Sequence, residues 1–430
     1  MREMKDSGIE WIGQIPKDWK IIKGKYVLEY LQKPVKDGDG VITCFRDGEV
    51  TLRSNRREDG FTLSDKEIGY QGIDVGDLVV HGMDGFAGAI GISDSRGKAS
   101  PVLNVFNSKY SKRYLMYYLR SMAFSNVFIA LASGIRVRSC DLSWNKLANL
   151  PYPTTSYEEQ TEIVRYIDSQ CSEIDATAED IQKEISLLED YKKSVITEAV
   201  TKGLNPDAEM KDSGIEWIGQ IPKHWKVVRL EFLSWVRARL GWKGLKADEY
   251  VDEGYPFLSA FNIQDSKIKW EPLNFITKER FDESPEIMVA CGDVLLLKDG
   301  AGVGKCARID SLPKGDSTVN SSLAVITCFD NLNYRYLYYS FNSSFFSNLI
   351  NLKLNGMGVP HLTQEELRKF IVLLPCVKEQ QQIADFLDAK CSEIDAIIAD
   401  KKRQRGILAD YKKSLIYEYV TGKKEVPVHE

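Results

Sequence analysis

Three short fragments of the sequence have residue types that could bind a small molecule or a flipped base. DGFAGAIG (84–91) is similar to the F-x-G-x-G loop that holds S-adenosylmethionine, NLPYP (149–153) to the N-P-P-Y motif that grips a flipped adenine, and GAGVGKC (300–306) to a phosphate loop. Each fragment differs from its motif at a position that the chemistry requires. Ile90 replaces a glycine, the prolines of NLPYP are displaced, and Cys306 replaces a hydroxyl residue. We therefore interpret the fragments as glycine turns or helix starts, and we expect no catalysis from this chain.

Cysteine and histidine do not indicate a metal site either. The eight cysteines are scattered without a C-x-x-C pair, and the four histidines are too dispersed to form a cluster. The chain has 43% hydrophobic and 28% charged residues, no run of 18 apolar residues and no signal peptide at its start. We expect a cytoplasmic globular protein with reduced core thiols and no cofactor of its own.

Basic and polar residues on predicted strands and turns are the candidates for contact with DNA. The planar fork of arginine can hold guanine O6 and N7 or clamp a phosphate. The net charge of −5 does not reveal such a surface, and an ordinary solvated surface is the alternative for each residue. The candidate DNA-binding residues are Arg46, Arg53, Arg56, Arg57, Arg136 and Arg138 in the first half and Asn262, Gln264, Lys267, Lys269, Lys298, Lys305 and His361 in the second.

These candidates lie in the two halves of an internal repeat. The stretch MKDSGIEWIGQIPKDWK (4–20) returns at 210–226, and its only change is His224 in place of Asp18. The stretches EQTEIVRYIDSQCSEIDA (159–176) and DYKKSVITEAVT (190–201) return in similar form at 379–396 and 410–421. Between the shared blocks only a skeleton recurs, such as Gly76-Asp77 against Gly292-Asp293. A kept frame with a divergent filling predicts two modules of one design that differ in what they recognise.

Two long helices end the halves. Apolar residues in 158–201 recur at alternating spacings of 4 and 3, which is a coiled-coil seam, and 379–421 continues the same register. Lys401 and Arg405 interrupt the second stripe and could meet the acidic first helix. Neither helix can bury its stripe alone, so we expect them to pair. The predicted seam residues are Ile167, Cys171, Ile174, Ala178, Ile181, Ile185 and Leu188, and Leu387, Cys391, Ile394, Ile398, Leu408, Leu415 and Tyr419.

The stretches before the helices read as α/β modules, so the predicted fold class is mixed α+β. In the first module VITCF, EVTLR, DLVVH, GAIGI and PVLNVF have strand composition and lead to a helix near 111–131. The second repeats this plan with YPFLSAF, KIKW, DVLLL, SLAVITCF and a helix near 333–351. The predicted segments are 1–157 and 206–377 for the modules, and 158–205 and 378–430 for the helices.

The doubled opening stretch is apolar and aromatic but lacks the period of a helix or a strand. Its Gly and Pro indicate a turn, so we expect it to clamp onto the long helices or onto a partner subunit. It is repeated because its docking place is repeated.

This arrangement resembles the DNA specificity subunit of Type I restriction-modification systems over the whole chain. The resemblance rests on SGIEWIGQIPKDW and its copy, the Gly-Asp strand of each module, the Glu-Gln start of each long helix, and DYKKS in both helices. It implies two target-recognition domains that read an asymmetric bipartite DNA site, and two helices that form an antiparallel coiled coil with a pseudo-twofold relation. It also implies two methyltransferase subunits and restriction subunits as partners, which carry S-adenosylmethionine, ATP and magnesium.

We therefore expect a non-catalytic DNA-recognition and assembly subunit. One alternative is a self-contained methyltransferase or nuclease with duplicated domains, and the degraded motifs count against it. A second alternative is a protein scaffold that does not touch DNA. Binding of S-adenosylmethionine by the isolated chain would favour the first alternative.

Overall fold

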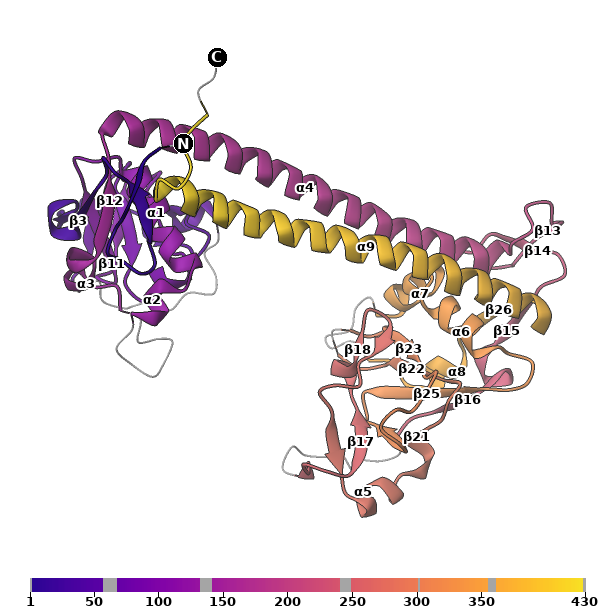
Figure 1. Cartoon of the computed structure of the whole chain (residues 1–430). Helices are drawn as coiled ribbons and strands as arrows, with labels where there is room; N and C mark the ends of the chain where they lie inside the picture. The colour runs from indigo at the N-terminus through magenta and orange to yellow at the C-terminus, as the bar shows by residue number, and fades with distance from the viewer. Residues whose placement is uncertain are drawn as a thin grey trace. The chain divides into compact units, whose positions relative to one another are not determined.

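The computed structural model describes residues 2–56, 68–131, 141–239, 249–300, 302–354 and 361–427. The chain forms two compact units, Met1–Gln182 with Arg403–Glu430, and Lys183–Lys402. The long helices α4 (Tyr157–Lys202) and α9 (Val377–Val420) each contribute one part to both units (Figure 1). We call residues 2–154 the first module and residues 207–375 the second module.

A four-stranded antiparallel sheet forms the centre of the first module, in the order β4-β11-β8-β9. Helix α1 packs on one face of this sheet and a layer of shorter strands covers the other. The strands are β1 (Met4–Asp6), β2 (Gln14–Pro16), β3 (Lys20–Lys23), β4 (Glu29–Leu31), β5 (Ile42–Cys44), β6 (Val50–Leu52), β7 (Gln71–Ile73), β8 (Leu78–His81), β9 (Ile90–Ile92), β10 (Gly97–Ala99), β11 (Leu103–Asn107) and β12 (Pro151–Thr154). The helices are α1 (Lys112–Phe124), α2 (Val127–Ala130) and α3 (Trp144–Asn149).

The second module repeats this sheet in the order β16-β25-β22-β23 and adds a second four-stranded sheet, β20-β17-β24-β21. Its strands are β13 (Met210–Asp212), β14 (Gln220–Pro222), β15 (Lys226–Arg229), β16 (Ser234–Arg237), β17 (Tyr255–Leu258), β18 (Ile263–Gln264), β19 (Lys267–Ile268), β20 (Asn274–Ile276), β21 (Met288–Val289), β22 (Asp293–Leu297), β23 (Cys306–Arg308), β24 (Ser317–Val319), β25 (Leu323–Cys328) and β26 (Ile371–Leu374). Its helices are α5 (Lys278–Asp282), α6 (Tyr334–Phe341), α7 (Ser344–Leu354) and α8 (Gln364–Arg368).

The central strands read as unbroken apolar runs because both faces of each sheet are buried. Leu78 and Val80 of β8 face the core that contains α1, whereas Val79 faces the layer of short strands. Strand β22 alternates in the same way between two cores. The Gly-Asp pair before each strand makes the turn: Gly76 and Gly292 have left-handed backbones, with φ of 84° and 91°. The sequence prediction of the strands of this skeleton is confirmed.

The helices that follow the sheets are shorter than predicted. The helix expected near 111–131 is divided into α1 and α2, because Asn126 takes a left-handed backbone with φ of 56°. The helix expected near 333–351 is divided into α6 and α7 at residues 342–343. These breaks lie at Asn and Ser, which compete with the helical backbone for hydrogen bonds.

The long helices are as long as predicted, and they pack against each other within each unit. In the first unit Lys412 Nζ lies 2.6 Å from Asp175 Oδ2, and Arg405 binds Gln182 further along. In the second unit Lys192 Nζ lies 2.6 Å from Asp395 Oδ1, and Lys401 pairs with Glu184. In each unit, as the residue number of the contact partner rises along α4, that of its partner on α9 falls. The two helices are therefore antiparallel in each unit. Most predicted seam residues are buried, while a coiled-coil supercoil stays a prediction.

The doubled opening stretch is a small hairpin, contrary to the expectation that it has no strand. Strand β1 pairs with β2, and β13 pairs with β14 in the same register. The expectation that it clamps a long helix is confirmed: Trp19 Nε1 donates to Glu159 at 3.2 Å, and Trp225 Nε1 donates to Glu379 at 3.0 Å. None of the helices in the described ranges is long and apolar enough to cross a membrane.

Candidate nucleic-acid interface

Each module has a turn directly after its central strand, and a second segment crosses this turn at the same point. We call residues 81–88 the first exit turn and residues 297–300 with 302–305 the second exit turn. The amide of Leu142 donates to the carbonyl of Gly82 at 2.8 Å, and the amide of Leu362 donates to the carbonyl of Lys298 at 2.8 Å. These two bonds identify one edge of the fold in both modules, and several candidate residues lie there.

At the first exit turn, Arg46 is held by a carboxylate. Its side chain is 67% exposed, and its Nη2 lies 2.9 Å from Asp84 Oδ1. His81 shapes the turn, because its Nδ1 accepts from the amides of Met83 and Asp84 at 3.2 and 2.9 Å. Burial lowers the pKa of His81, which keeps the imidazole neutral and able to accept. Arg46 therefore presents a guanidinium to solvent from a fixed position.

The other arginines of the first cluster lie on the neighbouring hairpin. Arg56 pairs with Asp47 at 2.6 Å and with Glu49 at 3.0 Å, and its guanidinium lies 4.1 Å from the ring centre of Phe45. Arg53 Nε approaches Thr43 Oγ1 at 3.4 Å. Arg57, Arg136 and Arg138 lie outside the described residues.

Sequence reasoning missed Arg120, which lies beside this hairpin. It comes from the last turns of α1, and its guanidinium lies 5.4 Å from the ring centre of Phe124. A Cβ on Gly48 would collide with Arg120 Nη1, so this glycine leaves room for the guanidinium. Burial lowers the pKa of Arg120. Arg120 lies inside an amphipathic helix, and nothing in the sequence pattern of that helix indicated that its side chain contacts Gly48 and Phe124.

At the second exit turn, one carboxylate holds two basic side chains. Asp299 Oδ2 lies 2.7 Å from Lys298 Nζ, and Asp299 Oδ1 binds His361 Nδ1. The backbones of Asp299 and His361 also form an isolated bridge. Lys298 is mostly covered, His361 is half exposed, and Lys305 is exposed at the far end of the turn. The structure thus brings these three predicted residues together: Lys298 and Lys305 lie on the turn, and His361 lies on the segment that crosses it.

The remaining candidates lie around the β18–β19 hairpin. Gln264, Lys267 and Lys269 are exposed, and Lys267 Nζ lies 3.6 Å from Asp395 Oδ2 on α9. Asn262 is buried, and its amide donates to the carbonyls of Lys269 and Pro272 while its oxygen accepts from Ser259. It stabilises the turn and does not present its amide to a ligand in this structure.

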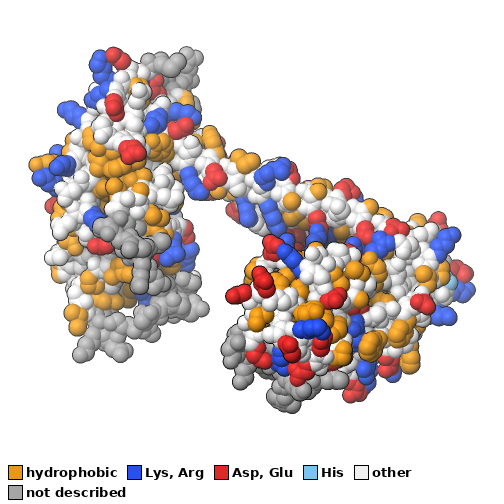
Figure 2. Space-filling view, turned by 60° about the horizontal axis from the view of Figure 1, so that its bottom comes forward, with side chains coloured by type: hydrophobic (Ala, Val, Ile, Leu, Met, Phe, Trp, Pro, Cys, Tyr) orange, Lys and Arg blue, Asp and Glu red, His pale blue; other side chains and the backbone are white. Residues whose placement is uncertain are grey.

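Acidic and basic side chains are intermixed on these surfaces. Figure 2 shows Lys and Arg beside Asp and Glu over the second module on the face drawn. A base edge needs a few fixed donors and acceptors, whereas a phosphate backbone needs only positive charge. The carboxylate-held cations at the exit turns suit contacts with base edges.

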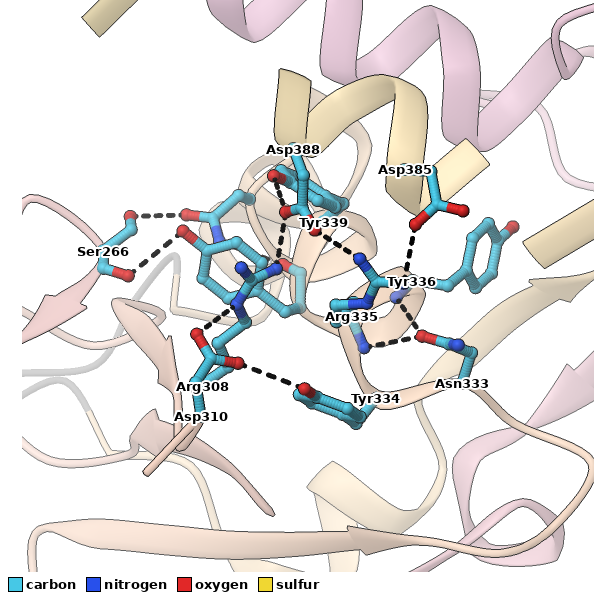
Figure 3. Close-up of polar contacts among 12 residues, drawn as sticks. Ser266, Arg308, Asp310, Asn333, Tyr334, Arg335, Tyr336, Tyr339, Asp385 and Asp388 are labelled. Carbon is cyan, nitrogen blue, oxygen red and sulfur yellow. Dashed lines mark hydrogen bonds and ion pairs between the residues drawn. The ribbon is translucent and has the colours of Figure 1, made fainter. Parts of the chain in front are cut away.

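Each module is anchored to its long helix through a partly buried aspartate. Figure 3 shows Asp388 of α9 between Tyr339, Arg308 and Arg335, and the distances to the donor atoms are 2.6, 2.7 and 2.5 Å. Burial opposes the ionisation of Asp388, but these hydrogen bonds outweigh it, so its pKa lies below the ordinary value. In the first unit Asp168 of α4 accepts from Arg113 at 2.6 Å and from Tyr117 at 2.5 Å.

The repeated Glu-Gln start of each long helix completes this anchor. The glutamate accepts from the clamp tryptophan, and the glutamine that follows is fully buried. Gln160 Oε1 accepts from the amide of Ser111 at 2.9 Å, and Gln380 Oε1 accepts from the amide of Asn333 at 2.8 Å. The anchors therefore hold both modules through equivalent side chains.

The described parts of the fragments that imitate catalytic motifs lie mainly in turns and in the strands β9, β12 and β23; Ala301 of GAGVGKC lies outside the described residues. DGFAGAIG includes a short 3-10 helix at Gly85–Ala87 and begins β9, and part of NLPYP forms β12. Within the described ranges, no group of three or more His, Cys, Asp and Glu could hold a metal ion.

Comparisons with known proteins agree with this architecture. A family model described as a Type I restriction modification DNA specificity domain matches residues 222–404. The Type I restriction enzyme MjaVIII specificity subunit of Methanocaldococcus jannaschii is 26% identical over 281 residues, which are 65% of this chain and 63% of that protein. The putative MjaX specificity subunit of the same organism is 24% identical over 440 residues and 96% of each chain.

Solved structures show the same fold. A chain described in a study of complex assembly and conformational transition of the type I R-M system has a TM-score of 0.70 at 16% identity, covering 95% of this chain and 99% of that one. The HsdS subunit from Thermoanaerobacter tengcongensis has a TM-score of 0.50 at 16% identity, covering 95% and 98%. The chain thus contains a region that matches the Type I restriction modification DNA specificity domain at residues 222–404, and over nearly its whole length it is similar in sequence and in fold to Type I restriction-modification specificity subunits.

Proposed function

We propose that this chain recognises a bipartite DNA sequence and assembles methyltransferase subunits on it. The duplicated frame with two different exit turns is the observation that carries this function. Each module is anchored to the helices in the same way, while its exit turn presents different side chains. We would expect this organisation if the two modules bind DNA half-sites of different sequence while they share one structural frame.

The DNA contacts follow from the exposed basic side chains. Four basic side chains lie at the surface of the modules: Arg46 and Arg56 in the first, and Lys305 and His361 in the second. Arg46, Arg56 and His361 are held by carboxylates, and Lys305 is exposed. Arginine reads guanine through O6 and N7, and lysine and arginine also neutralise phosphates. Net charge is no obstacle, because most of the excess of acidic over basic residues lies on α4.

The outer faces of the long helices suit two copies of one partner. Leu187 and Tyr191 of α4 are 68% and 50% exposed, and they lie one helical turn apart. Ile407 and Tyr411 of α9 hold the equivalent positions in the repeat and are 60% and 49% exposed. Each pair offers an apolar ridge to a helical surface. We assign them to the two methyltransferase subunits.

The chemistry belongs to the partners in this proposal. Methyl transfer, which needs S-adenosylmethionine, and DNA cleavage, which needs ATP and magnesium, would be carried out by the methyltransferase and restriction subunits. This chain would supply the DNA sequence preference and the frame, and it would act in the cytoplasm where the DNA is.

Selection from a random-sequence duplex pool tests this function. The full chain and its methyltransferase subunit are mixed with the pool, and the retained duplexes are sequenced. We expect two short preferred blocks separated by a spacer without preference, and we expect exchange of one module to change one block only. Retention without any sequence preference would contradict the proposal and favour a scaffold. Binding of S-adenosylmethionine by the chain alone would favour a self-contained methyltransferase.

A further inference from the structure

The two exit turns share a geometry that the sequence repeat does not reveal. In each module a carboxylate of the turn holds a side chain from another segment of the same module. Asp84 holds Arg46 from the β5–β6 turn, and Asp299 holds His361 at the start of the segment that leads to α8. The two carboxylates are not equivalent in sequence: Met83 stands where the second module has Asp299, and Gly300 stands where the first has Asp84.

The backbone fixes the same contacts. In the first module a Cβ on Gly88 would lie 2.6 Å from the carbonyl oxygen of Arg46, so the two turns pack directly together. In the second module the backbones of Asp299 and His361 form a bridge. Each held side chain is therefore placed by its backbone and oriented by its carboxylate.

These two contacts add little to folding stability, because both partners are exposed to solvent. Arg46 and Asp84 are 67% and 38% exposed, and His361 and Asp299 are 50% and 32% exposed. Surface pairs of this kind contribute little when measured. A carboxylate also weakens the attraction of its neighbouring cation to phosphate. The small gain in stability argues against a structural role, and the weakened attraction to phosphate argues against non-specific DNA binding. Both properties are compatible with a side chain that is held in place to contact a base edge.

The held side chains present different hydrogen-bonding atoms. Arg46 can only donate, and its fork matches guanine O6 and N7. An ionised carboxylate can only accept, so the Nδ1 of His361 that binds Asp299 carries the hydrogen. With the hydrogen on Nδ1, the Nε2 of the neutral form of this ring is an acceptor. Such an acceptor matches the exocyclic amine of adenine or cytosine.

We propose that Asp84 and Asp299 are positioning residues for base recognition, through which the first module reads guanine with Arg46 and the second reads an amine-bearing base with His361. This inference rests on the proposed function and names the chemistry of its two reading positions. The carboxylates act through the side chains that they hold, and they do not themselves face the base.

Selection from the random duplex pool with the full chain and its methyltransferase subunit provides the test. For Asp84→Ala we expect a loss of about tenfold in discrimination at one guanine position of the first block, with the second block unchanged. For Asp299→Ala we expect a loss of similar size at one adenine or cytosine position of the second block only. Asp84→Glu should restore part of the first preference. Asp94→Ala and Asp316→Ala, which remove exposed acids other than those that hold Arg46 and His361, are the matched controls.

Three results separate the outcomes. If the wild-type chain selects two blocks and both preferences survive Asp84→Ala and Asp299→Ala, the positioning role is wrong while the proposed function stands. If the controls reduce discrimination equally, net charge rather than position is responsible, and the inference is overturned. If the wild-type chain selects no sequence, the proposed function itself fails. Thermal unfolding of each variant, with Tm unchanged, excludes a merely structural effect.

Discussion

The anchor at Asp388 should stabilise the second unit more than its equivalent, Asp168, stabilises the first. Asp388 accepts hydrogen bonds from Tyr339, Arg308 and Arg335, and the side chains of both arginines are only 21% exposed. Asp168 accepts from Tyr117 and Arg113, and Arg113 is 51% exposed. The extra donor is Arg308, because the first module has Ile92 at the equivalent strand position.

The magnitudes follow from these differences. Removing Asp388 leaves two half-buried arginines, which retain their weaker pairs with Asp310 and Asp385. Breaking a buried ion pair costs about 3–5 kcal/mol, and a charged hydrogen bond contributes about 1.5–3 kcal/mol. We expect Asp388→Ala to cost about 3–4 kcal/mol of local stability and Asp168→Ala about 1–2 kcal/mol. The difference of about 2 kcal/mol is about a 30-fold change in the opening equilibrium.

Hydrogen exchange of the amides in α6 and α1 measures this difference separately for each unit. The double variant Arg308→Ile with Asp388→Ala should lose less than the sum of its single changes, because the two residues share one interaction. The pKa of Asp388 lies below its ordinary value, so its contribution is complete above about pH 4 and is lost as the pH falls through the lower folded pKa. Equal loss of protection in α6 and α1, or full additivity of the double variant, would refute this account.

Three further predictions concern the anchor, the helix faces and the thiols. Gln380→Ala should lower the stability of the second unit by about 2–4 kcal/mol, because it leaves the amide of Asn333 and two carbonyls unpaired in a buried site. Gln160→Ala should lower the stability of the first unit in the same way. Urea unfolding followed by hydrogen exchange measures both effects. Replacing Leu187 and Tyr191 by Ser should weaken one methyltransferase site, and replacing Ile407 and Tyr411 should weaken the other, each by about tenfold or more in titration calorimetry, whereas Lys278→Ala on α5 serves as an exposed control. Burial raises the pKa of Cys44 to about 12 and that of Cys391 to about 11, so below pH 9 a thiol reagent should modify the exposed Cys291 and Cys376 first, which peptide mass mapping would show; early modification of Cys44 would contradict its burial.

Much of the fold could be predicted because its signals are local. The seam of the long helices recurs every three or four residues, and the central strands are short apolar runs between glycine turns. The docking of the opening stretch could be predicted from its apolar and aromatic residues without a helix or strand period, together with its repetition. The breaks at Asn126 and at residues 342–343 could not, because they depend on how a short helix competes with side-chain hydrogen bonds and with the sheet below it.

The candidate site was harder to predict because surface residues give no periodic signal. Asn262 has the residue type of an adenine reader, yet its hydrogen bonds are all used inside a turn that includes Ser259. Arg120 has no distinguishing pattern in the sequence, and only Gly48 and Phe124 beside it reveal its position. The pairing of Asp84 with Arg46 joins residues that are 38 positions apart. Such contacts follow from the sheet topology rather than from local spacing.

The two copies of the opening stretch have nearly the same sequence but pack against different residues. In the first copy Ile12 is fully buried, and its carbonyl accepts from Lys423 at 2.8 Å while the carbonyl of Trp11 accepts from Tyr417 at 2.9 Å. In the second copy Trp217 is 47% exposed, because Thr197 and Gly203 stand where the first copy meets Tyr417 and Lys423.

The only change within this stretch follows the same logic. Asp18 pairs with Arg2, which also binds Glu159. The second copy has Ala208 in place of Arg2, and there His224 itself binds Glu379 at 2.8 Å. A nitrogen-bearing side chain next to the helix glutamate is thus kept, although a different residue supplies it.

This distribution of kept and changed positions connects the fold to the proposed function. Side chains that fasten a module to its helix are the same in both halves, namely Trp19 and Trp225, Glu159 and Glu379, Gln160 and Gln380, Tyr114 and Tyr336, and Asp168 and Asp388. At the exit turns the equivalent positions differ in charge: Gly82 against Lys298, and Asp141 against His361. A module can therefore change its hydrogen-bonding atoms without disturbing its anchor, since the two sets of residues share no partners among the described contacts. Two half-sites of different sequence can be read from one duplicated frame for this physical reason.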